Sequence, residues 1–128
     1  MEVYFDNSAT TKVMPEVIET MTDVMQNNYG NPSSLHRMGV NAEKLVKIAR
    51  ETIAKELNVP ASDVYFTSCG SEGNNLAIIG TASAFREKGE VITTKIEHKS
   101  VLKCYEHLEK QGFAVHYLDV DERGIINI

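Results

Sequence analysis

The chain has 128 residues, of which 42% are hydrophobic and 24% are charged, and its formal net charge is −5 at pH 7. This composition is typical of one globular domain, or of a piece of one, with enough apolar residues to form a core. The acidic balance gives no footprint for nucleic acid, and without an apolar run of membrane-spanning length or a signal peptide we expect a cytoplasmic protein that binds no membrane.

The first part of the chain predicts an extended arm, a helix and a loop. Residues 1–5 can form a short extended segment, and the small polar residues that follow at 6–11 are typical of a loop. Pro15 stands where a helix would begin, and apolar residues then recur at helical spacing as far as residue 25. We therefore predict an N-terminal arm and helix over residues 1–35 and a partial α/β domain over residues 36–128.

A long amphipathic helix is predicted from about Val40 to Leu57. Its apolar residues form a stripe, and acidic and basic side chains alternate along another face at i, i+4 spacing. Such alternation is typical of a solvated helix face and not of a binding site. Asn58 and Pro60 are expected to end this helix.

Residues 64–78 carry the pattern around which the chain is organised. β-Branched and aromatic residues at 64–66 predict a buried strand, residues 67–71 predict a tight turn, and an apolar helical pattern follows at once. The first N–H groups of a helix lack partners and lie at the positive end of its dipole, and Gly70 lets an anion approach them. Ser71 adds a hydroxyl donor. The turn is a candidate phosphate site, and the alternative is a serine that only caps the helix.

Strands and helices alternate in the rest of the chain. Short strands are predicted at residues 91–94 and 113–118, with a helix between them that begins near residues 97–100 and ends at Gly112. A polar turn at residues 119–124 precedes a last apolar run. This alternation predicts an α/β fold with a mostly parallel sheet and helices on both faces.

His98 is the candidate acid/base or ring-stacking residue. Ligands of parallel sheets bind beyond the carboxyl ends of the strands, and both the turn at residues 67–71 and residues 95–98 follow a predicted strand. A phosphate at the turn and the imidazole of His98 can therefore face one ligand. A partly exposed surface histidine is the alternative. His36 is a weaker candidate, because a structural polar contact would explain it.

The two cysteines, Cys69 and Cys104, show neither the pattern of a disulfide framework nor that of a metal site, so no metal is expected. A helix N-terminus would lower the thiol pKa of Cys69, although a small residue that fits the turn explains it more simply. The phosphate-loop and dinucleotide motifs are absent, so the phosphate would belong to a ligand of another kind.

Four sequence blocks resemble those of cysteine desulfurases, which are class V aminotransferase-like enzymes of the fold-type I pyridoxal-phosphate group. The blocks are YFDNSATT at residues 4–11, YGNPSSLH at 29–36, FTSCGSEGNN at 66–75 and EHKSVL at 97–102. They occur in the family's order and at similar spacing. The resemblance implies an incomplete N-terminal part of the large domain that binds pyridoxal 5′-phosphate (PLP).

The resemblance also implies roles for particular residues. Gly70 and Ser71 would bind the cofactor phosphate, and His98 would stack on the pyridine ring and help to move protons. Cys69 stands where the family often has glycine and Ser71 where threonine is usual, which keeps a small residue and a hydroxyl. Five residues would lie near the substrate, or near the active-site entrance and the dimer contact: Asn7, Ala9, Thr10, Asn31 and His36.

The reaction that the resemblance implies is the conversion of L-cysteine to L-alanine with sulfur left on an enzyme thiol, for iron–sulfur clusters or thio-cofactors. The family's Schiff-base lysine and persulfide-forming cysteine come after the part seen here, so we expect this chain to be inactive alone. The full-length enzyme would be a homodimer, with a sulfur-acceptor or scaffold protein as a further partner. The alternatives are a selenocysteine lyase or other class V enzyme, and a stand-alone phosphate-binding module without catalysis.

Overall fold

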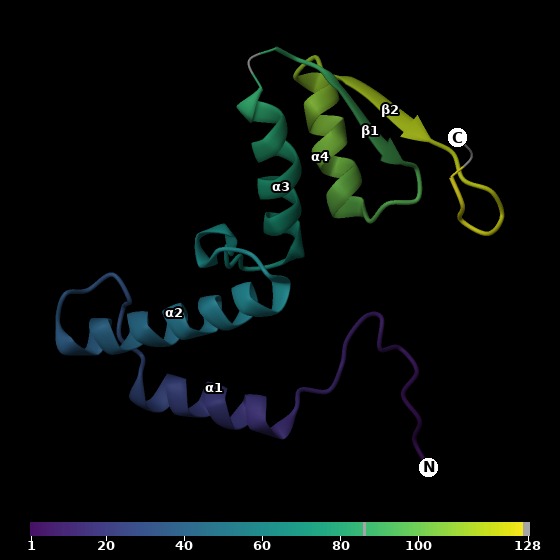
Figure 1. Cartoon of the computed structure of the whole chain (residues 1–128). Coiled ribbons are helices and arrows are strands. Elements are labelled where there is room, and N and C mark those ends of the chain that lie inside the picture. Colours follow the sequence, from purple (N-terminus) through teal and green to yellow (C-terminus); the bar gives the residue numbers. More distant parts are fainter. Residues whose placement is uncertain (86, 127–128) are drawn as a thin grey trace. The chain divides into compact units, whose positions relative to one another are not determined.

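The computed structural model of the chain describes residues 1–85 and 87–126. Over these residues it contains four α-helices, a short 3-10 helix and two β-strands (Figure 1). The chain forms two compact units, Met1–Tyr65 and Phe66–Ile128, which we call the N-terminal and the C-terminal unit. The predicted boundary near residue 35 lies within the first of these units and stays a prediction.

The N-terminal unit consists of helix α1 (Pro15–Asn27), helix α2 (Arg37–Leu57) and the 3-10 helix η1 (Ala61–Asp63). Helix α1 begins at its proline, as predicted, because the missing N–H of proline is not needed in the first turn. Helix α2 ends as predicted at Asn58, whose φ of 54° places it in the left-handed region that stops a helix.

Helix α2 begins three residues before the predicted start, because a side chain caps it. The Nδ1 atom of His36 accepts a hydrogen bond from the backbone N–H of Gly39 at 3.3 Å. Gly39 is buried, and a Cβ atom there would overlap the carbonyl group of Ser34. The loop before α2 therefore packs against the first turn of the helix only because residue 39 is glycine.

The C-terminal unit consists of helix α3 (Gly70–Ala84), strand β1 (Glu90–Thr94), helix α4 (Lys99–Lys110) and strand β2 (Ala114–Leu118). The two strands are parallel, and α4 contacts both of them while α3 packs along α4 (Figure 1). This arrangement confirms an α/β fold with a parallel sheet. The helix in contact with the sheet over the described residues is α4, so cover on the second face stays a prediction.

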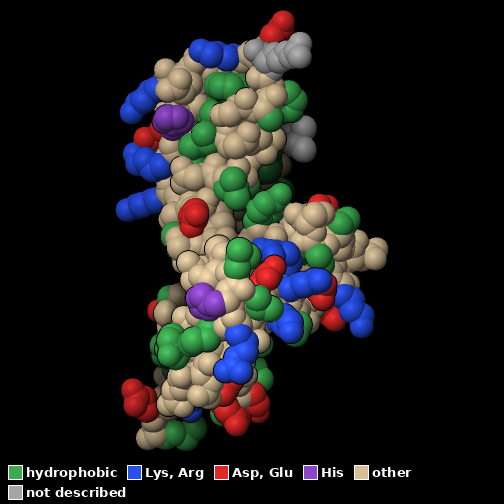
Figure 2. Space-filling view, turned by 90° about the vertical axis from the view of Figure 1, so that its left-hand side faces the viewer, with side chains coloured by type: hydrophobic (Ala, Val, Ile, Leu, Met, Phe, Trp, Pro, Cys, Tyr) green, Lys and Arg blue, Asp and Glu red, His purple; other side chains and the backbone are tan. Residues whose placement is uncertain are grey.

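The core of the C-terminal unit lies between α4, α3 and β1. Cys104 and Leu108, one turn apart on α4, are 1% and 2% exposed, and Ala82 of α3 and Thr93 of β1 are also buried. Gly112, with a φ of 90°, follows the end of α4 and confirms the predicted glycine stop. Hydrophobic side chains also reach the surface on the face seen in Figure 2, and many large ones are exposed.

The predicted buried strand at residues 64–66 is wrong for this structure. Val64 is extended, but residues 64–66 lie outside the described sheet, which contains only β1 and β2, and Tyr65 is 73% exposed. An extended segment becomes a strand only when a neighbour takes up its backbone N–H and C=O groups. The composition of this segment predicts an extended conformation, but it does not show whether a neighbouring strand is present to pair with it.

The end of the described chain is a polar turn, as predicted. Asp121 accepts hydrogen bonds from the backbone N–H groups of Arg123 and Ile125, each at 2.9 Å. Both bonds lower the pKa of the Asp121 carboxyl group, and the bond from the Ile125 N–H has the larger effect. Val120 and Ile126 form an isolated antiparallel bridge across the turn. The remainder of the predicted apolar run, residues 127–128, lies outside the described residues.

Candidate functional site

The candidate phosphate turn is the start of α3. Cys69 is the N-cap residue in an extended conformation, and its side chain makes no capping hydrogen bond. Gly70 begins the helix, and a Cβ atom built on it would meet no atom within 4 Å. Residues 68–71 are all exposed. The start of α3 is therefore an exposed helix N-terminus, at the positive end of the helix dipole.

Ser68 does not cap α3, because its polar groups bind a side chain from inside the helix. Both its backbone N–H and its hydroxyl group donate to Oε2 of Glu72, each at 2.6 Å. The hydroxyl and then the backbone N–H of Ser68 lower the pKa of the Glu72 carboxyl group. Glu72 thus folds the turn back onto the helix as a carboxylate. Of the two serines that could have capped the helix, Ser68 and Ser71, neither is the N-cap residue, and sequence reasoning missed Glu72.

Cys69 is an exposed thiol at this turn. The backbone N–H of Glu72, the Ser68 hydroxyl and the backbone N–H of Ser71 lower the pKa of the Cys69 thiol. The negative charge of the Glu72 side chain opposes this shift. The groups that stabilise a thiolate here are the same ones that would hold a phosphate, so thiolate and phosphate compete for them.

His98 is the N-cap residue of α4. Its Nδ1 atom accepts a hydrogen bond from the backbone N–H of Ser100 at 3.1 Å and lies 2.8 Å from the Ser100 hydroxyl oxygen. The imidazole itself is exposed. Capping therefore occupies one ring nitrogen of His98 and fixes the direction of the ring.

A hydrogen bond between the two helices connects the phosphate turn to His98. The side-chain amide of Asn74, in the second turn of α3, donates to the Ser100 hydroxyl oxygen at 2.8 Å. Both helices begin at the lower end of the C-terminal unit in Figure 1, the end toward which β1 and β2 also point. The structure thus places the start of α3, with Gly70 and Ser71, and the start of α4, with His98, at the same end of the C-terminal unit.

The other predicted site residues belong to the N-terminal unit. Residues 7–9 form a turn in which the backbone N–H groups of Ala9 and Thr10 donate to the carbonyl of Asp6 at 3.1 and 3.3 Å. The Asn31 side chain accepts a hydrogen bond from the backbone N–H of Ser33 at 2.9 Å. Ala9, Thr10 and Asn31, like Asn7 and His36, were predicted to lie near the substrate, the active-site entrance or the dimer contact. These roles stay predictions.

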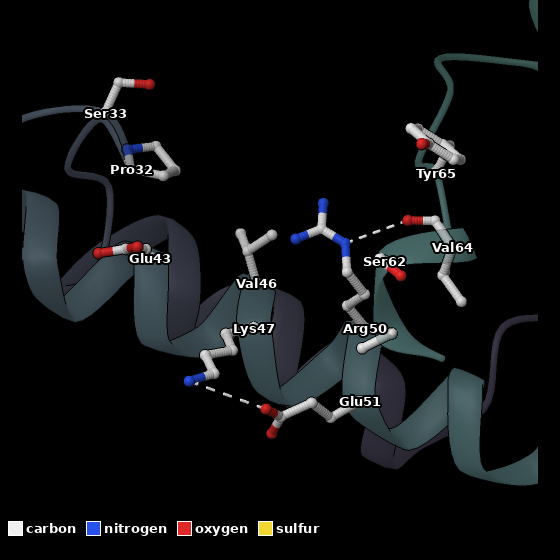
Figure 3. Close-up of a pocket in the computed structure, with 11 residues that line it drawn as sticks. Pro32, Ser33, Glu43, Val46, Lys47, Arg50, Glu51, Ser62, Val64 and Tyr65 are labelled. Carbon is white, nitrogen blue, oxygen red and sulfur yellow. Dashed lines mark hydrogen bonds and ion pairs between the residues drawn. The ribbon is translucent and has the colours of Figure 1, made fainter. Parts of the chain in front are cut away.

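The N-terminal unit also contains a cavity of about 600 Å³ between α2 and residues 61–65 (Figure 3). Arg50 reaches across it and donates from Nε to the Val64 carbonyl oxygen at 3.1 Å. Lys47 pairs with Glu51 along α2 at 3.9 Å. The cavity is lined by both acidic and basic side chains, and none of the predicted site residues lines it. We therefore assign no ligand to this cavity.

Two further functions can be tested on the described residues. Over residues 1–85 and 87–126, no group of three histidine, cysteine or acidic side chains is arranged to hold a metal ion. No helix in this part of the chain is both long enough and apolar enough to cross a membrane.

The family follows from a comparison with known proteins. Residues 3–128 match the family model for class-V aminotransferases. The chain therefore belongs to the class-V aminotransferase family, and the family depends on PLP.

Its relatives include cysteine desulfurases. The chain is 48% identical over 128 residues to the cysteine desulfurase IscS of Clostridium botulinum, a match that covers 99% of this chain and 32% of the relative. The solved structure of a NifS-like protein superposes with a TM-score of 0.91 at 44% identity, over 99% of this chain and 35% of that one. A structure described as SspA in complex with cysteine gives a TM-score of 0.82 at 43% identity, over 89% and 33% of the two chains. The chain spans about a third of the length of these relatives.

Proposed function

We propose that this chain is the N-terminal part of a cysteine desulfurase, an enzyme that converts L-cysteine to L-alanine and leaves the sulfur on an enzyme thiol. The observation that carries the proposal is the link between the open start of α3 and the His98 ring through Asn74 and Ser100. The names of its relatives, with nearly half of the residues identical, support the same activity.

The start of α3 fits the phosphate group of PLP. The open space at Gly70 lets a phosphate oxygen reach the backbone N–H groups of the first turn, and the exposed Ser71 hydroxyl adds a donor. His98 would stack on the pyridine ring and would help to move protons. When bound, PLP supplies the electron sink for the reaction.

Further parts of the proposal concern the whole protein. We assign it L-cysteine as substrate, a homodimeric assembly, a sulfur-acceptor or scaffold protein as partner, and a place in the cytoplasm, supplying iron–sulfur clusters or thio-cofactors. Neither Lys95 nor Cys69 is assigned the role of the lysine that binds PLP or the cysteine that carries sulfur. Lys95 is instead paired with Asp119, with Nζ and Oδ1 2.7 Å apart.

A product assay on the complete gene product tests the activity. With PLP added, we expect L-cysteine to yield alanine in step with sulfide released by a reducing thiol. The same assay with L-selenocysteine measures the rival preference for selenium. Turnover confined to selenocysteine, or an amino-acid product other than alanine, would overturn the proposal.

The phosphate site has a separate test in Ser71. Replacing its hydroxyl in Ser71→Ala removes one donor to a charged phosphate, a bond that contributes roughly 1.5–3 kcal/mol. The dissociation constant of PLP should therefore rise roughly tenfold to a hundredfold. Ser71→Thr keeps the hydroxyl and should bind as the unaltered protein does. Fluorescence titration of both variants with PLP measures the effect, and equal affinities would remove Ser71 from the site.

A further inference from the structure

We infer that Asn74 and Ser100 are positioning residues that hold neutral His98 as the Nε2–H tautomer, so that its imidazole offers a hydrogen-bond donor and no free ring lone pair. The part of this inference that concerns the cofactor rests on the proposed function. The part that concerns the ring depends only on the contacts within the C-terminal unit.

The first step is the role of Nδ1. The backbone N–H of Ser100 can act only as a donor, and it lies 3.1 Å from Nδ1 of His98. That N–H group therefore favours a lone pair on Nδ1, and with it a proton on Nε2 of the neutral ring. Protonating Nδ1 would place two N–H groups against each other and would weaken this cap of α4.

The second step is the direction of the side-chain hydrogen bonds. The amide nitrogen of Asn74 is a donor and lies 2.8 Å from the Ser100 hydroxyl oxygen. That oxygen accepts from Asn74, and its own proton is then directed to Nδ1, 2.8 Å away. Two side-chain groups thus donate in one direction, from α3 through α4 to the ring, and the first bond polarises the second.

The third step is the rigidity of the arrangement. Asn74 and Ser100 are both half-buried at the contact between α3 and α4, whereas the His98 ring is exposed. The helix pair that carries the phosphate turn at Gly70 therefore also sets the orientation of the ring. A ligand held by its phosphate at the start of α3 would meet a histidine whose direction is already fixed, and little ordering would remain to be done on binding.

This tautomer determines whether His98 can donate a hydrogen bond or accept a proton in the proposed site. A neutral imidazole with a proton on Nε2 acts as a hydrogen-bond donor to negative charge that develops on a ligand. Its only lone pair is already used by Ser100. His98 can therefore accept a proton only if the contact between Nδ1 and Ser100 is broken.

The test reads the tautomer directly by NMR. The protein is labelled with 15N-histidine, and the His98 signals are assigned by their loss in His98→Gln. In the neutral ring and without PLP, we expect Nε2 to show the shift of a protonated nitrogen and Nδ1 that of an unprotonated one. A mixture rich in the Nδ1–H tautomer would overturn the inference.

The sharpest variant reverses the hydrogen-bond chain. In Asn74→Asp the carboxylate accepts the Ser100 hydroxyl proton, and the hydroxyl oxygen then presents a lone pair to Nδ1. We expect the fraction of the Nδ1–H tautomer to rise severalfold. Asn75→Asp adds the same charge one residue further on, at a side chain bonded to the Ser71 carbonyl at 2.7 Å, and should leave the tautomer unchanged. Equal spectra for the two aspartate variants would overturn the inference.

A second pair of variants covers the case in which Asn74→Asp fails to fold. Ser100→Ala removes one of the two donors to Nδ1 and should admit some Nδ1–H tautomer, whereas Ser100→Thr keeps the hydroxyl and should not. If Ser100→Ala and Ser100→Thr give the same ratio of tautomers, the inference is wrong. Because these readouts need no cofactor, failure of PLP binding in the Ser71 titration would reject the proposed function and leave the tautomer result standing.

Discussion

Cys69 is the residue at which this chain differs most in chemistry from an ordinary phosphate turn. Its thiol pKa lies below the ordinary value of 9.0 because the backbone N–H of Glu72 and the Ser68 hydroxyl stabilise the thiolate. A thiolate there would repel a phosphate dianion and compete for the same donors. We therefore expect the affinity for PLP to fall as the pH rises through this lowered pKa.

Titrations with PLP between about pH 7 and pH 9 would measure the effect of Cys69 against a variant that cannot ionise there. Cys69→Ser should lose the part of the pH dependence that the thiol causes. Cys104→Ser is the matched control. The Cys104 thiol lies in the core, and its burial raises its pKa, so it should not ionise in this pH range. If Cys69→Ser follows the same curve as the unaltered protein, the thiolate does not compete with phosphate.

Glu72 leads to a prediction about the stability of the turn. Its pKa is lowered below 4.5, first by the Ser68 hydroxyl and then by the Ser68 backbone N–H. A carboxyl group whose pKa is lowered on folding stabilises the fold above its unfolded pKa, and this stabilisation is lost as the pH falls through the folded value. We expect the protection of the Ser68 amide, which is its exchange rate compared with the intrinsic rate at the same pH, to fall as the carboxylate becomes protonated.

Hydrogen exchange of the Ser68 amide in Glu72→Gln would test this role. The amide side chain keeps the size of the glutamate but offers a weaker acceptor, so the exchange should be faster at neutral pH and should lose its dependence on the carboxylate. Glu87→Gln, at an exposed position outside the turn, is the control. Unchanged protection of Ser68 in Glu72→Gln would mean that the carboxylate does not hold the turn.

The sequence indicated candidate site residues but not the contacts between their helices. Gly70, Ser71 and His98 could be found because a phosphate turn and a helix cap have short local patterns. The bond between Asn74 and Ser100 could not, because the two residues are 26 positions apart and meet only once α3 has packed on α4. Glu72 had a local signal, a glutamate four residues after a serine, that could have been read as a reach back to the turn.

The helices and strands could likewise be predicted where they depend on local sequence, but not where they depend on a distant segment. Helices α2 and α4 were predicted within a few residues, because an apolar stripe and a terminal glycine or proline are local features. Strands β1 and β2 were predicted from β-branched runs and are observed as a parallel pair, from Glu90 opposite Ala114 to Thr94 opposite Leu118. The segment at residues 64–66 is also rich in β-branched and aromatic residues but lies outside the described sheet, since joining a sheet depends on a neighbouring strand that composition does not specify.

Helix α4 is the element on which the core of the C-terminal unit depends, and Leu108 tests this. The side chain is 2% exposed, and Leu108→Ala would remove buried apolar atoms and leave a cavity. We expect the free energy of unfolding to fall by about 2–5 kcal/mol. His107→Ala, at the exposed neighbouring position, should change it by about 0.5 kcal/mol or less. Urea denaturation would compare the two, and equal losses would place the core elsewhere.

At the scale of the whole molecule, the exposed apolar surface is large for 128 residues. One face of the sheet presents Ile92, which is 60% exposed, beside the exposed His116 of β2. Surfaces of this kind are usually covered by another part of a protein or by a partner. The chain spans about a third of its relatives' length, so we propose that the rest of such a protein covers this face.

The 128-residue chain expressed by itself should therefore associate as its concentration rises and bind a dye that reports exposed apolar surface. Ile92→Thr keeps a β-branched side chain and so the strand, but makes this face more polar, and it should reduce both signals. Ile18→Thr, at an exposed position on α1 in the N-terminal unit, adds a similar polarity to an element that is not part of the sheet and is the control. Sedimentation velocity and dye fluorescence measure both effects. A chain that stays monomeric, binds no dye and still binds PLP tightly would instead be a self-sufficient phosphate-binding module, because nothing in its behaviour would then require a covering segment.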